Sequence, residues 1–283
     1  MTGGFPDERS RNAYLAVYDT LLDWPVPAEE ITVETRFGTT HVRRSGPPDG
    51  VPLVLLHGVL ATSLSWQEYV EPLARRCAVY AVDSLGEPGR SVQTAPMPDA
   101  GSVAGWLAEV LAGFGLDRAH LAGISRGGWL ALNLACRAPE RVASVTAFDP
   151  LGLAPMGMRQ YRWMAAGLAV MLAPRCVRRR FGPGSRYSAF LDERHRRLVL
   201  AQWRHRTTVF MGDTITDDQW RSIPVPVTLV LGGRSPAHDA GEVRRKLAAV
   251  APGITVDVIP GAGHGMDLLR PDLVVERILR MVG

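Results

Sequence analysis

Residues 119–138 decide the fold of this chain, and they read AHLAGISRGGWLALNLACRA. The first six residues form an apolar strand pattern, and the last twelve have a helical pattern. Between them, residues 123–127 fit Gly-x-Ser-x-Gly, with Ser125 at the centre. A serine in this strand–turn–helix setting occupies a strained, exposed turn, and flanking glycines are needed because side chains there would clash. The sequence therefore predicts that Ser125 is presented as a nucleophile.

Short apolar runs alternate with longer helical patterns on both sides of this segment, which is typical of a mostly parallel sheet flanked by helices. Two runs alternate with polar residues and meet at Gly38, which predicts an antiparallel hairpin at the sheet edge. The other six are apolar on both faces, as a covered central sheet requires. These patterns predict an α/β fold with eight strands, at residues 31–37, 40–44, 53–56, 78–82, 119–123, 142–148, 227–231 and 256–259.

The distribution of strand patterns divides the chain into two parts. Helical patterns separate the strands at residues 66–75, 103–114, 129–137, 242–250 and 272–281, and an N-terminal helix is expected at about 11–22. No strand signal occurs between residues 149 and 226, an interval that is too long for a connection and too apolar for a disordered linker. We therefore expect a helical cap insertion (residues 150–225) on an α/β core domain of residues 1–149 and 226–283.

The composition is that of an ordinary globular protein. The 283 residues are 46% hydrophobic and 21% charged, which excludes disordered, collagenous and coiled-coil classes. The longest apolar stretch, residues 164–173, is well short of the roughly 20 residues of a membrane-spanning helix, so no membrane association is expected. The polar N-terminus lacks the order of a secretory signal, which predicts a cytoplasmic location. Three widely spaced cysteines predict neither disulfides nor a zinc site.

Basic charge is concentrated in the cap insertion. The chain has a net charge of +4, whereas residues 150–225 hold 13 arginines against five acidic residues. Such a basic patch can contact nucleic acid, a membrane surface or an anionic ligand. It has no helix-turn-helix, zinc-finger or RNA-binding motif beside it, so we expect no nucleic-acid partner. The ordinary interpretation is a solvated arginine face.

A nucleophilic serine needs a base, because its hydroxyl is a weak nucleophile at neutral pH. Among seven histidines, His264 is the candidate, since it lies in the glycine-rich loop PGAGHG (residues 260–265) after the last strand. His57 follows the first central strand, and we expect it to brace that loop. The backbone N–H groups of Val59 and Arg126 are expected to hold an oxyanion. No metal-binding motif such as H-E-x-x-H is present, so neither a metal nor another cofactor is expected.

Four segments together resemble the α/β-hydrolase family. They are LLHG at 55–58, DSLGEPGRS at 83–91, GISRGG at 123–128 and GAGHG at 261–265, and the resemblance spans nearly the whole chain. The segments YDTLLDWPVP (18–27) and RFGTTHV (36–42) resemble the small bacterial carboxylesterase branch that includes naproxen-ester hydrolases.

The resemblance implies a serine hydrolase that cleaves a carboxylic ester of a small, largely apolar molecule through an acyl-enzyme. The expected partner is thus a small-molecule ester or thioester. Thioesterases, lactonases, cyclases, lyases and ligand-binding proteins share the fold, so these alternatives stay open. The sequence does not indicate the oligomeric state.

The acid that would orient His264 has two candidates. The family commonly places it in a Gly-x-x-Asp pattern after the strand ending at Leu231, and the matching residue here is Ser235. The carboxylesterase branch places its aspartate four residues later, at Asp239, which we select. The alternative is Asp149, at the end of the strand that follows the serine. Alternatively, Asp149 is a turn residue whose side chain accepts hydrogen bonds from backbone N–H groups.

The cap insertion is expected to line the substrate pocket and to limit water. Its candidate wall residues are Trp163, Met164 and Met171, each of which could instead pack within the insertion. The side chain of Arg126 is a further substrate-binding candidate, because an arginine beside the nucleophile could bind a substrate carboxylate or phosphate bidentately. Alternatively, its guanidinium pairs with a nearby acid.

Overall fold

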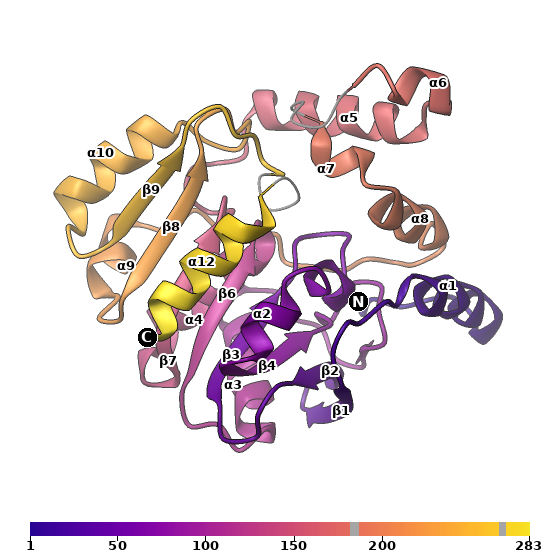
Figure 1. Cartoon of the computed structure of the whole chain (residues 1–283), viewed down its shortest axis with the longest axis horizontal. Helices are drawn as coiled ribbons and strands as arrows, with labels where there is room; N and C mark the ends of the chain where they lie inside the picture. The colour runs from indigo at the N-terminus through magenta and orange to yellow at the C-terminus, as the bar shows by residue number, and fades with distance from the viewer. Residues whose placement is uncertain (182–186, 266–269) are drawn as a thin grey trace.

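The computed structural model describes residues 1–181, 187–265 and 270–283, and one sheet forms its centre (Figure 1). Its strands are β1 (Ala28–Thr35), β2 (Gly38–Ser45), β3 (Val51–Leu56), β4 (Cys77–Val82), β5 (Val92–Gln93), β6 (Ala119–Ile124), β7 (Val142–Phe148), β8 (Val227–Gly232) and β9 (Thr255–Ile259). The order across the sheet is β1-β2-β4-β3-β6-β7-β8-β9, and β5 pairs with β2 outside this path. β1 and β2 form an antiparallel hairpin, β2 joins β4 antiparallel, and the pairs from β4 to β9 are parallel. The predicted eight-stranded, mostly parallel sheet is therefore confirmed, with β5 as an additional short strand.

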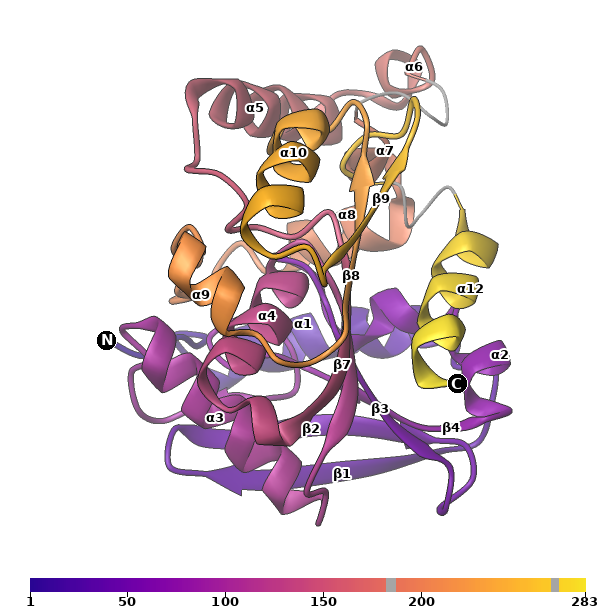
Figure 2. The same ribbon diagram turned by 90° about the vertical axis from the view of Figure 1, so that its left-hand side faces the viewer.

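Helices cover both faces of this sheet. They are α1 (Glu8–Leu21), α2 (Val70–Ala74), α3 (Ala100–Gly113), α4 (Arg126–Arg137), α5 (Met158–Leu172), α6 (Arg175–Arg178), α7 (Ser188–Leu191), α8 (Glu193–Ala201), α9 (Asp217–Ser222), α10 (Ala240–Val250) and α12 (Pro271–Val282). Figure 2 shows α2 and α12 on one side of the sheet and α3, α4 and α10 on the other. Leu53 and Leu55 of β3 pack in the cluster with α2 and α12, whereas Val54 and Leu56 pack with α3 and α4. Because successive strand residues point to opposite faces, a strand that is apolar throughout needs both helical layers.

The N-terminal helix starts earlier than the sequence pattern indicates. The side chain of Asp7 accepts a hydrogen bond of 2.7 Å from the backbone N–H of Ser10, so α1 begins at Glu8 rather than near residue 11. Aspartate is a favourable residue at this position because its carboxylate satisfies an N–H group that has no partner within the helix. Tyr14 and Tyr18 of α1 pack with Leu198 of α8, which joins this helix to the 150–225 segment.

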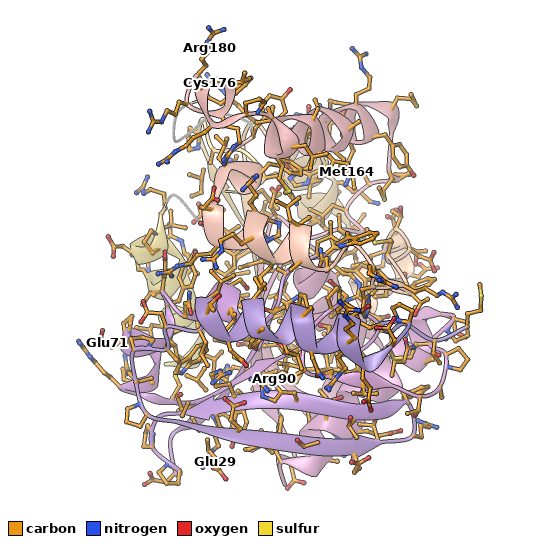
Figure 3. All side chains as sticks on the ribbon, turned by 90° about the vertical axis from the view of Figure 1, so that its right-hand side faces the viewer. Glu29, Glu71, Arg90, Met164, Cys176 and Arg180 are labelled. Atoms are coloured by element: carbon orange, nitrogen blue, oxygen red, sulfur yellow. The ribbon has the colours of Figure 1, made fainter. Side chains whose placement is uncertain are left out.

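The described residues of the interval without a strand signal form the helices α5 to α9, joined by irregular segments at residues 149–157 and 202–216. Helices α5 to α8 lie beyond the edge where the parallel strands end, and α9 returns to the sheet, where Trp220 joins the core cluster (Figure 1). In Figure 3, Cys176 and Arg180 lie at the outer end of this region, and Met164 lies on the side of α5 that faces the rest of the protein. None of the described helices is long and apolar enough to cross a membrane.

Candidate active site

Ser125 lies in the sharp turn between β6 and α4. Its backbone has φ 53° and ψ −113°, a conformation that residues other than glycine rarely adopt. The flanking glycines permit this turn because their backbones touch neighbouring chain segments. A Cβ atom on Gly127 would lie 2.1 Å from the carbonyl oxygen of Leu56, and one on Gly123 would lie 2.3 Å from Gly127. The strand–turn–helix predicted from the sequence is therefore present, and it sets Ser125 at the end of the sheet where the parallel strands finish.

A chain of hydrogen bonds joins Ser125 to a histidine and an aspartate. Ser125 Oγ lies 3.0 Å from His264 Nε2, and His264 Nδ1 lies 2.5 Å from Asp149 Oδ2. Ser125 is 7% exposed and Asp149 1%. The structure thus brings together the serine and the histidine that the sequence analysis selected.

The carboxylate beside His264 is Asp149, so the selection of Asp239 is wrong. Asp239 is exposed and forms the N-cap of α10, where its side chain accepts a 2.9 Å hydrogen bond from the N–H of Glu242. Asp149 follows β7, the strand next to β6 in the sheet, and its positive φ of 44° turns the chain sharply at that point. Its place beside β6 brings its carboxylate within reach of the histidine.

Hydrogen bonds keep the buried Asp149 ionised. Oδ1 accepts from the Gly232 N–H at 2.9 Å and lies 3.2 Å from His238 Nε2, and Oδ2 accepts from Ser235 Oγ at 2.6 Å as well as from His264. Burial alone would raise the pKa of Asp149, but the interactions with His238 and His264 outweigh it and hold the pKa well below its usual range. An ionised Asp149 fixes the proton of His264 on Nδ1, so that Nε2 is unprotonated and can accept the serine proton.

Two backbone amides, those of Val59 and Arg126, are the oxyanion-hole candidates from the sequence. Val59 lines the cavity at the serine, and Arg126 is the first residue of α4. Within the described residues, neither N–H has a hydrogen-bond acceptor. The loop before Val59 is fixed by His57, whose Nε2 accepts from the Ser84 N–H at 3.0 Å and whose Nδ1 donates to the Gly58 carbonyl at 2.8 Å. The predicted bracing role of His57 is therefore confirmed, and the arrangement suits an oxyanion hole.

The side chain of Arg126 is not a substrate-binding group, and that prediction is wrong. Its guanidinium is fully buried and pairs with Glu87, with 2.9 Å between Arg126 Nη1 and Glu87 Oε1. Arg126 Nε also donates to the carbonyl oxygen of Phe210 at 3.1 Å. The alternative interpretation, a guanidinium paired with a nearby acid, is confirmed. The guanidinium of Arg126 does not reach the substrate because it is buried and already has Glu87 as its counterion inside the protein.

An apolar cavity of about 370 Å³ opens at Ser125 and His264. Trp163, Met164 and Met171 line it, as the sequence analysis expected, and Trp163 meets the ring of His264 edge-on, with 5.3 Å between ring centroids. Other lining residues come from within and from outside the 150–225 segment, among them Leu21, Leu64, Ile124, Leu151, Leu198 and Met211. The volume lies in the usual range for small-molecule pockets. Among the described residues, no group of three or more His, Cys, Asp or Glu side chains could hold a metal ion.

The sequence analysis did not identify the roles of some residues at the site. Asp239 and Glu242 have the spacing of a helix N-cap signature, Asp-x-x-Glu, and this signal could have identified Asp239 as a capping residue. His238 and Glu87 had no such signal, because nothing local in the sequence shows that their side chains are buried. Both lie in loops, and only the folded chain places His238 against Asp149 and Glu87 against Arg126.

The chain is similar to known proteins over nearly its whole length. A model of the alpha/beta hydrolase family matches residues 53–277. Carboxylesterase YbfK of Bacillus subtilis is 30% identical over 273 residues, which cover 94% of this chain and 92% of that protein. The uncharacterized carboxylesterase nap of the same organism is 29% identical, covering 94% and 91%.

Solved structures agree with this similarity. The crystal structure of carboxylesterase CesB (YbfK) from Bacillus subtilis has a TM-score of 0.82 at 27% identity, and covers 97% of this chain and 98% of that one. The crystal structure of naproxen esterase from Bacillus subtilis has a TM-score of 0.81 at 28% identity, covering 96% and 98%. We conclude that this chain is a hydrolase and belongs to the α/β-hydrolase family.

Proposed function

We propose that this chain is a serine carboxylesterase, which hydrolyses the ester of a small, largely apolar molecule through an acyl-enzyme. The observation that carries the proposal is the hydrogen-bonded series Ser125–His264–Asp149 at the opening of an apolar cavity. The carboxylesterase names of the similar proteins support the same reaction class.

The proposed mechanism uses each of the three side chains in one role. Ser125 Oγ attacks the ester carbonyl while His264 Nε2 accepts its proton, and the protonated histidine then donates that proton to the departing alcohol. Water then gives a proton to His264 and attacks the acyl-enzyme. His264 returns this proton to Ser125 Oγ as the bond to the acyl group breaks, which releases the carboxylic acid and restores Ser125. Asp149 remains ionised throughout and stabilises the positive charge that develops on the imidazole ring.

The negative charge that develops on the former carbonyl oxygen needs hydrogen-bond donors of its own. We assign them to the N–H groups of Val59 and Arg126, which have no acceptor in the described structure. Arg126 is also the first residue of α4, so the positive end of the helix dipole lies at this point. Both contributions act more strongly on the full charge of the oxyanion than on the neutral carbonyl, so they lower the barrier more than the free energy of the bound substrate.

The cavity defines the substrate class of the proposal. Its walls are largely apolar, and the guanidinium of Arg126 is paired inside the protein, so an uncharged acyl group fits better than an anionic one. We propose that residues 150–225 act as a cap that supplies Trp163, Met164 and Met171 to the acyl site and excludes water from it.

A panel of p-nitrophenyl esters and acyl thioesters tests this function. The wild-type protein should hydrolyse uncharged esters with apolar acyl groups, and Ser125→Ala should lower kcat by about 10⁴-fold or more. Ser144→Ala is a matched control, because Ser144 Oγ makes a similar 2.7 Å hydrogen bond to His120 Nδ1 in a buried part of the sheet. Turnover at the wild-type rate in folded Ser125→Ala protein would refute the proposal.

A further inference from the structure

Glu87 is a buried carboxylate that takes no part in the steps described above. Its side chain has no exposed surface, and each of its oxygens accepts one hydrogen bond. Oε2 accepts from the backbone N–H of Leu60 at 2.8 Å, and Oε1 accepts from Arg126 Nη1 at 2.9 Å. A buried carboxylate is costly unless it is paired and hydrogen-bonded, so both contacts support the burial of Glu87.

The two partners of Glu87 belong to the two halves of the proposed oxyanion hole. Leu60 directly follows Val59, whose N–H is one donor, and Arg126 itself supplies the other N–H. The carboxylate therefore links the loop after β3 to the first residue of α4. These segments are more than sixty residues apart in the chain, so their separation at the oxyanion depends on tertiary contacts.

The loop beside Val59 adopts a conformation that needs support. Leu60 has φ 61°, in the left-handed region that a branched side chain rarely adopts. Its N–H finds its acceptor in Glu87, and the neighbouring Ala61 N–H makes a longer bond of 3.3 Å to the Gly58 carbonyl. A charge-assisted bond from a buried carboxylate is stronger than a neutral one, which suits it to hold a strained loop.

The other end of the link is fixed at two points. Arg126 Nη1 binds Glu87, and Arg126 Nε donates to the carbonyl oxygen of Phe210 in the segment between α8 and α9. The planar guanidinium makes these two contacts in fixed directions, which a lysine ammonium could not reproduce. Hydrogen bonds therefore hold the bridge from Leu60 through Glu87 to Arg126 at both ends.

We propose that Glu87 is a positioning residue for the oxyanion hole, which holds the N–H groups of Val59 and Arg126 at the separation that the oxyanion requires. This inference rests on the proposed function. Donors stabilise an oxyanion only within about 2.7–3.1 Å of its position, and a displacement of about 1 Å can cost roughly 10²-fold in rate. Glu87 should therefore affect kcat far more than KM.

Glu87→Gln breaks the bridge at constant size. A glutamine has one oxygen and one NH₂ group, whereas both contacts of Glu87 are with donors. The NH₂ group must face either the Leu60 N–H or the guanidinium of Arg126, so one of the two links is lost. We expect kcat for p-nitrophenyl butyrate to fall by about 10²-fold, with KM within about threefold of the wild-type value.

A pair of inhibitors separates positioning from loss of structure. An alkyl trifluoromethyl ketone forms a hemiketal on Ser125 whose oxyanion occupies the hole, whereas the alcohol of the same carbon skeleton only fills the cavity. In Glu87→Gln, the inhibition constant of the ketone should rise by about the same factor as kcat falls, and that of the alcohol should stay constant. An equal rise for both ligands would overturn the positioning role.

Two further variants control for stability. Glu30→Gln removes a carboxylate from another buried arginine, Arg43, at the edge of the sheet, and should leave kcat unchanged. The double variant Glu87→Met/Arg126→Met replaces the buried ion pair by apolar side chains, an exchange that often preserves stability. We expect it to keep the melting temperature near the wild-type value while kcat remains low, because Leu60 has lost its acceptor.

The outcomes distinguish this inference from the proposed function. Wild-type protein that hydrolyses no ester and does not react with a fluorophosphonate would refute the proposed function. Wild-type kcat in Glu87→Gln would refute the positioning role alone. If Glu87→Gln does not fold, the double variant decides: a low kcat with weak binding of the ketone supports positioning, and wild-type kcat in this variant overturns it.

Discussion

Exchange of Asp149 for asparagine replaces one carboxylate oxygen by an NH₂ group at almost constant size. Oδ1 faces the backbone N–H of Gly232 at 2.9 Å, and Oδ2 faces His264 Nδ1 at 2.5 Å. The Gly232 N–H is fixed by the backbone, so the asparagine keeps its oxygen there and turns its NH₂ group toward His264. The histidine must then accept at Nδ1, which moves its proton to Nε2, where it blocks proton transfer from Ser125.

The expected loss in kcat for Asp149→Asn is therefore large. A histidine held in the wrong tautomer costs about 10⁴-fold, which corresponds to roughly 5 kcal/mol of transition-state stabilisation. The assay is kcat for a p-nitrophenyl ester at neutral pH, with the melting temperature measured by circular dichroism on the same samples. Asp239→Asn is the matched control, and it should keep wild-type kcat because asparagine caps a helix as well as aspartate does.

Two outcomes of this comparison would contradict the prediction. Wild-type kcat in folded Asp149→Asn protein would refute the role of this aspartate. A 10⁴-fold loss confined to Asp239→Asn would show that the exposed N-cap residue acts in catalysis, contrary to the hydrogen bonds described above.

Three further predictions follow from other contacts. Gly127→Ala should lower stability by about 1–3 kcal/mol or more in urea unfolding, because the new Cβ meets the Leu56 carbonyl oxygen; Gly253→Ala, with open space around it, is the control. Trp163→Ala should raise KM for apolar esters by roughly two- to tenfold through the lost aromatic contacts of about 0.5–1.5 kcal/mol, and an unchanged KM would exclude Trp163 from the acyl site. Burial alone would lower the pKa of His41, but its contacts with Asp83 and Glu30 raise it above 6.5. His41 therefore stabilises the fold fully below about pH 6.5 and loses this contribution as the pH rises through its folded pKa, so wild type should lose more unfolding free energy than His41→Gln between about pH 6 and pH 8. Equal losses in the two proteins would contradict this assignment.

Local features of the chain were predictable from sequence. The turn at Ser125 needs small residues at Gly123 and Gly127, and the strand and helix on either side have their own apolar patterns. The sheet could be predicted for the same reason, since a strand apolar on both faces requires cover on both faces. β5 was missed because two residues carry no periodic pattern.

The choice of the acid depended on tertiary structure. Asp149 and Asp239 both follow strands at the correct edge of the sheet, and sequence position alone does not tell which carboxylate reaches His264. The deciding contacts join Asp149 to Gly232 and Ser235, which lie over eighty residues further along the chain. The family pattern stated above would place the acid at Ser235, and here Ser235 Oγ donates a hydrogen bond to Asp149 Oδ2.

The same limit applies to the side chain of Arg126. An arginine after the nucleophile could turn toward substrate or into the protein, and its partner Glu87 comes from a distant loop. Charge alone could not decide between these directions. Only the folded chain brings the two side chains together, between the loop after β3 and α4.

Modification by a fluorophosphonate tests most directly whether Ser125 is an activated nucleophile. After reaction at neutral pH, mass spectrometry of the intact protein and of its proteolytic peptides should show one adduct per chain, located on Ser125. Ser125→Ala should stay unmodified, and Asp149→Asn should react far more slowly, because His264 no longer accepts the serine proton. Absence of reaction in the folded wild-type protein, or an adduct on another residue, would contradict the proposal that this serine, histidine and aspartate form the catalytic centre.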